Sequence, residues 1–90
     1  MSIKIDASRD IIGYRIDVQV IAGEGEAIAS VSTSYEDFSI ADDNLSPPEV
    51  QYQRTFTQVG GYTPGVERTV MVTVTNDSGK QRTASKRWQD

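Results

Sequence analysis

Apolar residues in this chain alternate with polar ones along short runs, and this period of two is the feature that most limits the fold. In residues 13–22, GYRIDVQVIA, every second residue from Tyr14 onward is apolar, while Arg15 and Asp17 fall between them. Residues 66–75 repeat the pattern with valines and threonines. Successive side chains of a β-strand point to opposite faces, so each run predicts a strand with one buried and one solvated face.

Shorter runs complete an all-β pattern, and no amphipathic helical period stands out. In the third run Ile28 and Val31 are out of phase by one residue, which predicts a bulge. Phe38 and Ile40 mark a short fourth strand, and a loop is expected over 41–49 because prolines there forbid ladder pairing. The last run is polar and basic, as in an edge strand. The seven predicted strands are 2–6, 13–22, 27–35, 38–40, 50–59, 66–75 and 80–88.

Ninety residues suit one domain with a single modest core. Seven strands joined by turns predict an antiparallel two-sheet β-sandwich over residues 1–90, with a small open barrel as the competing architecture. Residues 7–12 are expected to form a loop, and Val50 and Val66 are expected to face the core. The NDSG of residues 76–79 is expected to be a hairpin turn rather than an ion site, because its glycine suits the left-handed position.

Residues 62–80, YTPGVERTVMVTVTNDSGK, resemble the C-terminal part of bacterial immunoglobulin-like and PKD-like modules. In both, an aromatic-x-Pro-Gly corner leads into an alternating strand, a tight acidic turn with glycine, and the last strand. The IASV of residues 28–31 is similar to the opening of their third strand. The family's turn usually begins with Asp, and here Asn76 holds that position. The resemblance implies an immunoglobulin-like sandwich, and such modules serve as spacers, adhesion units, appendages of carbohydrate enzymes or decorations of phage particles.

The composition argues against several kinds of site. The chain contains no cysteine and no histidine, which removes disulfides, thiolate nucleophiles, the common zinc sites and the Ser-His-Asp triad. Its formal charge of -4 gives no general attraction to nucleic acid or to an anionic membrane. Ser85 and Lys86 are adjacent on a predicted strand and would point to opposite faces, so they do not form a catalytic pair. We therefore expect no enzymatic activity, no cofactor, and neither nucleic acid nor membrane as a partner.

Charge is unevenly distributed along the chain. Between Arg15 and Arg54 there is no lysine or arginine, while eight acidic residues lie there. Asp42, Asp43 and Asn44 are candidates for a calcium site, because calcium binds several oxygen ligands that converge from loops. The alternative is a solvated acidic surface, which is the usual role of such a run.

The C-terminal run is basic, and it supplies most of the candidate contact residues. Trp88 beside Arg87 offers a stacking surface for a sugar, although a lone tryptophan in a small sandwich more often covers the end of the core. Loops vary in shape without disturbing the core, so residues 35–49 and 60–65 are also expected to make contacts. The candidate contact residues are Tyr35, Tyr62, Lys86, Arg87 and Trp88.

The leading hypothesis is a non-catalytic structural or interaction module of the spacer, adhesion or surface-decoration type, with a protein or glycan partner. The alternative is a carbohydrate-binding accessory module, with or without calcium, which requires two exposed and coplanar aromatic rings on one face. A third hypothesis is edge-to-edge self-association through the basic last strand. The N-terminal segment lacks the apolar stretch of a signal peptide, which leaves open whether the chain is an excised module of a secreted or virion protein. Partner, oligomeric state and cellular location also stay open.

Overall fold

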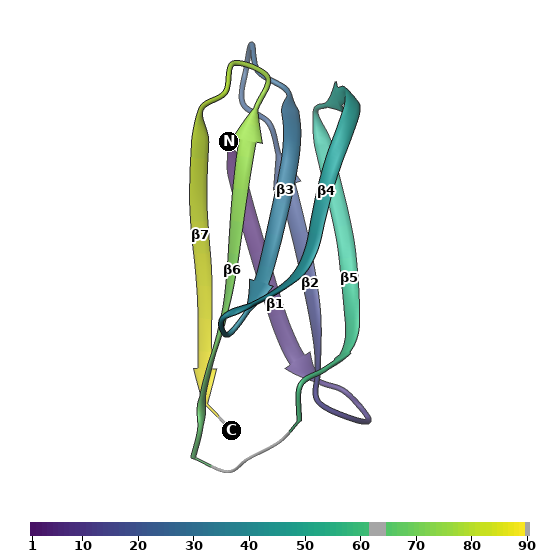
Figure 1. The fold of residues 1–90 in the computed structure, drawn as a ribbon, viewed down its shortest axis with the longest axis vertical. Helices are drawn as coiled ribbons and strands as arrows, with labels where there is room; N and C mark the ends of the chain where they lie inside the picture. Colours follow the sequence, from purple (N-terminus) through teal and green to yellow (C-terminus); the bar gives the residue numbers. More distant parts are fainter. Residues whose placement is uncertain (62–64, 90) are drawn as a thin grey trace.

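The computed structural model describes residues 1–61 and 65–89, which form seven β-strands in two antiparallel sheets packed face to face (Figure 1). No helix occurs in these residues. The predicted all-β sandwich is therefore confirmed. The strands are β1 (Ser2–Arg9), β2 (Tyr14–Ile21), β3 (Ile28–Tyr35), β4 (Phe38–Glu49), β5 (Gln51–Val59), β6 (Glu67–Asn76) and β7 (Gln81–Gln89).

One sheet has the strand order β1-β2-β5 and the other β4-β3-β6-β7. In immunoglobulin domains the second strand likewise lies between the first and the fifth, and the sixth lies between the third and the seventh. The fourth strand differs. In constant-type immunoglobulin domains it lies beside the fifth strand at the edge of the first sheet, whereas here β4 pairs with β3 in the second sheet. β7 is an edge strand, as its polarity predicts.

The core lies between the two sheets and consists mostly of β-branched residues, which suit strands. The alternating faces predicted for β2 and β6 are confirmed, since the apolar residue at every second position is buried. Burying each such side chain is worth about 1.5–3 kcal/mol. The buried hydrophobic residues are Ile5, Tyr14, Ile16, Val18, Val20, Ile28, Val31, Tyr35, Tyr52, Val70, Val72 and Val74.

The bulge predicted in β3 is present. The register of β3 shifts between Ile28 and Ser30 against both β4 and β6. This extra residue lets Ile28 and Val31 face the same core, and both are fully buried.

Strand β4 is longer than predicted. The segment 41–49 was expected to be a loop, but residues 41–44 pair with β3 in register. The neighbouring strand supplies hydrogen-bond partners that override the low strand propensity of its Asp and Asn residues. Residues 45–48 form no ladder pair with β3. Pro47 and Pro48 therefore lie where the ladder needs no backbone N–H donor, which proline lacks.

The expected inward positions of Val50 and Val66 are wrong. Val50 is 64% exposed and Val66 is 37% exposed. Each precedes the first residue of its strand, Gln51 and Glu67 respectively. The alternation of faces holds only inside the ladder, so it does not fix the side chain of a residue in the connection before it.

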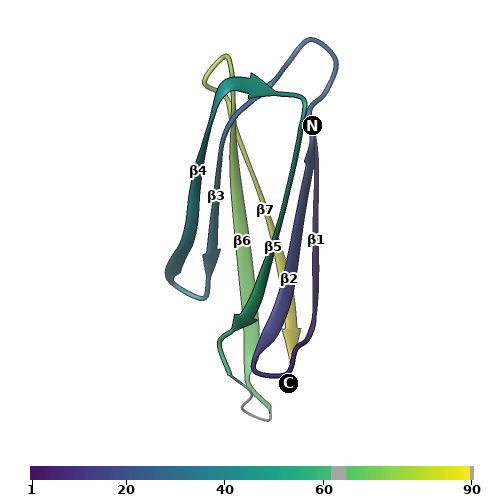
Figure 2. The same cartoon turned by 90° about the vertical axis from the view of Figure 1, so that its right-hand side faces the viewer.

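The sandwich is elongated, with extents of 44 × 19 × 18 Å. We call the end with the β2–β3, β4–β5 and β6–β7 connections the upper end, as oriented in Figure 1; the N-terminus lies toward it. The β1–β2 connection, the end of β5, the start of β6 and the C-terminal end of β7 form the lower end (Figure 2). The two ends therefore present different connections and different chain termini.

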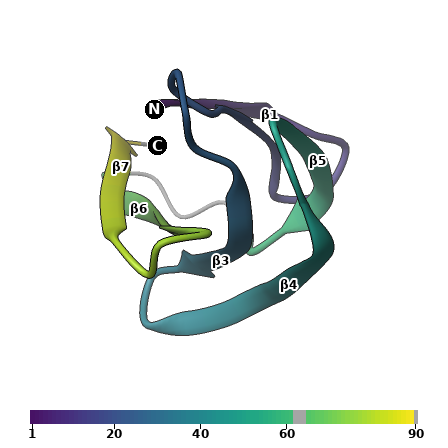
Figure 3. The same ribbon diagram turned by 90° about the horizontal axis from the view of Figure 1, so that it is seen from above.

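In the view from above, β4 curves away from β3 toward β5 (Figure 3). A polar cluster joins β4 and β5 on this side of the sandwich. The Tyr52 hydroxyl donates a hydrogen bond to the Asp43 carboxylate, and Arg54 Nη1 lies 2.8 Å from both carboxylate oxygens. Arg54 breaks the apolar pattern of β5 for this reason. The cluster joins the two sheets where no ladder connects them.

Candidate functional site

The β1–β2 turn at the lower end is held firmly by backbone interactions. The Asp10 carboxylate accepts hydrogen bonds from the Ile11 N–H at 2.7 Å and from the Gln58 N–H of β5 at 3.0 Å. These two bonds lower the pKa of Asp10 and keep its carboxylate ionised. Gly13 has φ 68°, and a Cβ there would overlap the carbonyl oxygens of Val59 and Gly60. The turn is therefore fixed against the end of β5.

Two isoleucines project from this fixed turn into solvent. Ile11 is 89% exposed and Ile12 is 60% exposed. Turns usually carry Gly, Asn, Asp, Ser or Pro, because those residues suit turn geometry and water. An adjacent pair of exposed isoleucines is therefore unusual at a turn, and it makes this turn the candidate contact surface. The sequence signal for it is the pair of isoleucines in a segment predicted to be a loop, but the pair was not among the predicted contact residues.

A hollow of about 300 Å³ lies beside the turn, between the ends of β1 and β7. The Tyr14 and Trp88 rings meet edge to face, with centroids 5.0 Å apart and an interplanar angle of 72°. Two of its lining residues, Arg9 and Tyr14, flank the turn in the chain, whereas Ile11 and Ile12 do not line the hollow. The lining residues are Ala7, Ser8, Arg9, Tyr14, Trp88 and Gln89.

The aromatic contact residues predicted from the sequence do not form an exposed platform in the described residues. Tyr35 is buried, so its assignment to a contact surface is corrected: it is on the inward face of β3, and Gly60 packs against its ring. Trp88 is half-buried and packs against the core, with its centroid 6.4 Å from that of Tyr35. Trp88 thus covers the end of the core, which was the structural alternative. Tyr62 lies outside the described residues.

The two predicted basic contact residues lie on the edge strand β7 and are exposed. Arg87 Nε lies 3.5 Å from Glu67 Oε1 of the neighbouring strand. Such a pair of exposed charges contributes little to stability. Lys86 pairs in register with Val70, and so it belongs to the inward-pointing side of β7, where β1 runs alongside.

The calcium candidates are separated by strand geometry. Asp42 accepts a hydrogen bond from the Ser32 hydroxyl at 2.6 Å, whereas Asp43 turns inward to Tyr52 and Arg54. Asn44 follows on β4 opposite Ser30. Adjacent strand residues point to opposite faces, so the Asp42 and Asp43 carboxylates do not converge. Within 1–61 and 65–89, no three Asp, Glu, His or Cys side chains form a group that would hold a metal ion.

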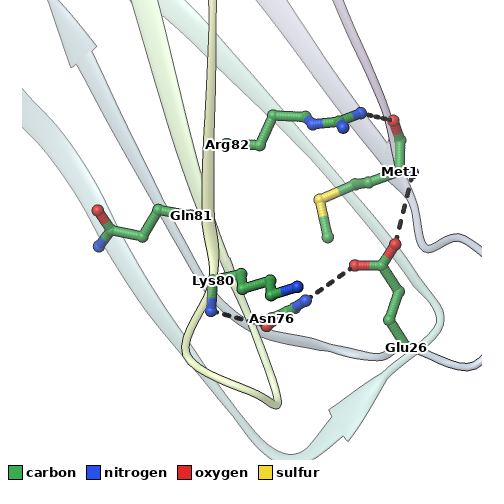
Figure 4. A pocket seen from close by; sticks show the side chains of 6 residues that line it. All are labelled: Met1, Glu26, Asn76, Lys80, Gln81 and Arg82. Carbon is green, nitrogen blue, oxygen red and sulfur yellow. Dashed lines mark hydrogen bonds and ion pairs between the residues drawn. The ribbon is translucent and has the colours of Figure 1, made fainter.

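The β6–β7 turn at the upper end is the hairpin predicted for residues 76–79. Asn76 Oδ1 accepts hydrogen bonds from the backbone N–H groups of Ser78 and Lys80, and Gly79 has φ 85°. The Asn76 amide donates to Glu26 Oε1 at 3.1 Å, at the edge of a hollow of about 280 Å³ (Figure 4). This hydrogen bond is the main reason that the pKa of Glu26 is lowered, followed by the backbone bond from Gly23. An aspartate at position 76 would lack this donor.

Comparisons with protein-family models, with curated proteins and with solved structures found no match to this chain. Among the described residues, no helix is long and apolar enough to cross a membrane.

Proposed function

We propose that this chain is a non-catalytic interaction module that binds a protein partner through its lower end. The observation that carries the proposal is the exposure of Ile11 and Ile12 on a turn that Asp10 holds in place. A preformed turn loses little conformational entropy on binding, so more of the gain from apolar burial becomes affinity. Burying one isoleucine is worth about 1.5–3 kcal/mol.

A protein partner suits these residues better than a glycan. Sugar recognition needs an open aromatic face together with polar groups, and Trp88 is engaged with the Tyr14 and Tyr35 rings. Ile11 and Ile12 offer aliphatic surface and no hydrogen-bonding side chain. Aliphatic anchors of this kind fit an apolar pocket on a protein.

The electrostatics favour a binding role over catalysis. A general acid needs a carboxyl group whose pKa is raised toward neutrality. Hydrogen bonds that tie parts of the fold together lower the pKa values of Asp10, Glu26 and Asp43 instead. These three carboxylates therefore stay ionised and act as acceptors within the scaffold.

The test uses a double variant, Ile11→Ser with Ile12→Ser, and a matched control, Phe38→Ser. Phe38 is the first residue of β4 and is 72% exposed. The β3–β4 turn beside it lies apart from the β1–β2 turn (Figure 2). Tagged proteins are used to capture partners from the source cells, and thermal unfolding is measured in parallel. We expect the double variant to keep its unfolding midpoint and lose the captured protein, while the control keeps both. Equal capture by all three proteins, or a double variant that unfolds well below the parent, would contradict the proposal.

A further inference from the structure

We infer that the free edge of β7 binds an extended, acidic segment of another protein by strand addition. The inference goes beyond the proposed function, because β7 runs along one side of the sandwich (Figure 1), whereas Ile11 and Ile12 project from the lower end. Among the described residues, three features of this edge carry it: backbone groups that the sheet leaves unpaired, hollows beside the strand, and an excess of positive charge.

Within the described residues, the backbone of β7 is paired on one side only. β7 is the last strand of its sheet, and its nine residues include neither proline nor glycine. The Asn76 N–H donates to the Lys80 carbonyl, and the pairing with β6 repeats at every second residue from there. The residues in between turn their N–H and C=O groups toward the free edge; they include Thr83, Ser85 and Arg87. Such a row of groups is a template for another strand.

There is space beside this edge on the side that faces β1. The two strands belong to different sheets and form no ladder with each other. Residues near the start of both line the hollow of about 280 Å³ at the upper end, and residues near the end of both line the hollow of about 300 Å³ at the lower end. At the upper end Arg82 Nη1 donates across the gap to the Met1 carbonyl at 2.9 Å (Figure 4). Side chains of an added strand therefore have room next to β7.

The face of β7 that is directed toward the core is basic. Arg82 and Lys86 both pair in register with buried valines of β6, so they belong to this face, with the half-buried Ala84 between them. Lys80 lines the upper hollow together with Arg82. All three cations are exposed, and so they are accessible to a partner.

Within residues 1–61 and 65–89, no carboxylate forms an ion pair with these three cations. Glu26, which lines the upper hollow, lies 3.5 Å from the Met1 ammonium, and on β1 Asp6 pairs with Lys4. Asp77 of the β6–β7 turn accepts a hydrogen bond from a backbone N–H of the β2–β3 connection. When Glu26 and Asp77 are counted against the three cations and the ammonium, two positive charges remain, and one remains without the ammonium. The edge therefore attracts an acidic strand.

The spacing of this face defines the segment that fits. Side chains of an added strand alternate between the two faces of the sheet, so three residues at every second position lie beside Arg82, Ala84 and Lys86. Two acidic residues with an apolar residue between them match this row, which gives the pattern acid-x-apolar-x-acid. A basic or uncharged strand would leave Lys86 without an opposite charge, and inward charges protect sheet edges from unwanted pairing in this way.

The probe is a synthetic peptide of nine residues, the length of β7. It carries glutamate at positions 3 and 7, valine at position 5 and threonine elsewhere, with both ends blocked. A matched peptide has the second glutamate at position 6, which puts the two acids on opposite faces of a strand. A third peptide carries lysine in place of both glutamates. Each is titrated into the ¹⁵N-labelled protein, and the shifts of the backbone amides report the place and the strength of binding.

We expect the first peptide to shift the amides of β7, with binding that weakens at high salt, and the lysine peptide to leave the parent unchanged. Lys86→Glu should weaken binding about tenfold. Arg87→Glu makes the same change in net charge at the next residue, on the outer face beside Glu67, and should have little effect. The lysine peptide tests the parent alone, so that comparison does not depend on how a variant folds. No shift of the β7 amides, equal affinity for the first and matched peptides, or equal losses in both variants would overturn the inference.

Discussion

Replacing Tyr52 with phenylalanine tests whether the polar cluster between β4 and β5 holds the two sheets together. The substitution removes only the hydroxyl that donates to Asp43 and leaves the ring in the core, where Tyr52 is 8% exposed. Arg54 keeps both of its contacts to the carboxylate. The measured effect is therefore that of one hydrogen bond between β5 and β4.

The expected loss is about 1.5–2 kcal/mol of unfolding free energy. A hydrogen bond to a charged group contributes roughly 1.5–3 kcal/mol, and we take the lower part of this range because the Asp43 side chain is 28% exposed and keeps Arg54. For a domain of this size, 1 kcal/mol corresponds to a fall of about 4–8 °C in the unfolding midpoint.

The pH dependence identifies the acceptor. The hydrogen bond from Tyr52 and those from Arg54 hold the pKa of Asp43 below its ordinary value. In the unfolded chain the pKa of an aspartate is near 3.9. Because the pKa of Asp43 is lower in the folded state, its ionised carboxylate stabilises the fold at pH values above 3.9, and this stabilisation is lost as pH falls through the folded-state pKa. The difference between parent and Tyr52→Phe should thus be constant from pH 5 to 8 and shrink below about pH 4.

The alkaline limb has the opposite sign. Burial and then the bond to Asp43 raise the pKa of Tyr52, so the folded state keeps its proton where an unfolded tyrosine, with a pKa near 10, ionises. The stabilisation that comes from the raised pKa of Tyr52 is fully present below the pKa of the unfolded state. It is lost as pH rises from that pKa toward the pKa of the folded state. The phenylalanine variant has no such group, so the difference should also shrink above about pH 10.

Urea unfolding of both proteins at several pH values measures these differences. Asp42→Asn is the matched control, because Asp42 is the next acidic residue of β4 and bonds outward to Ser32. If Tyr52→Phe matches the parent at pH 7, or if the difference is the same at pH 3 and pH 7, the hydrogen bond to Asp43 does not stabilise the fold.

Two further substitutions test other contacts. Asn76→Asp replaces the donor to Glu26 with a second carboxylate, so the unfolding midpoint should fall at pH 7 and recover when Glu26→Gln is added; no recovery would contradict the assigned bond. Gly60→Ala places a Cβ 2.6 Å from the Tyr35 hydroxyl oxygen at φ 67°; overpacking and strain together should cost about 2–4 kcal/mol. Gly25→Ala, with a similar φ but open space, should cost about 1 kcal/mol, and equal losses would refute the packing argument.

Alternation predicted the parts of the fold in which one face is fully buried. It identified β2, β6 and the β3 bulge because a misplaced valine or isoleucine there would lose its burial. It did not identify the length of β4, since Asp42, Asp43 and Asn44 have low strand propensity and only the pairing with β3 reveals them as a strand. Val50 lies outside the core because it stands in the connection between β4 and β5, where no ladder fixes the direction of its side chain.

The candidate site was harder to predict because it depends on which residues meet in space. Tyr35 and Trp88 were both predicted to be aromatic contact residues. In the structure Tyr35 lies on the inward face of β3, and Trp88 covers the end of the core. Asp43 was a calcium candidate because oxygen ligands in a predicted loop suit that ion, but pairing with β3 makes the segment a strand, and Asp43 bonds to Tyr52 and Arg54. Ile11 and Ile12 carried a visible signal, yet their exposure depends on how Asp10 anchors the turn.

The way this turn is anchored separates its stability from its surface chemistry. Asp10 bonds to the backbone N–H groups of Ile11 and Gln58, and no side-chain atom of Ile11 or Ile12 takes part. The Ile11 and Ile12 side chains can therefore be exchanged with little effect on folding, whereas loss of the Asp10 carboxylate would release the turn. An Asp10→Ala variant should consequently weaken binding at the lower end with both isoleucines still present, because a released turn must be ordered again when the partner binds.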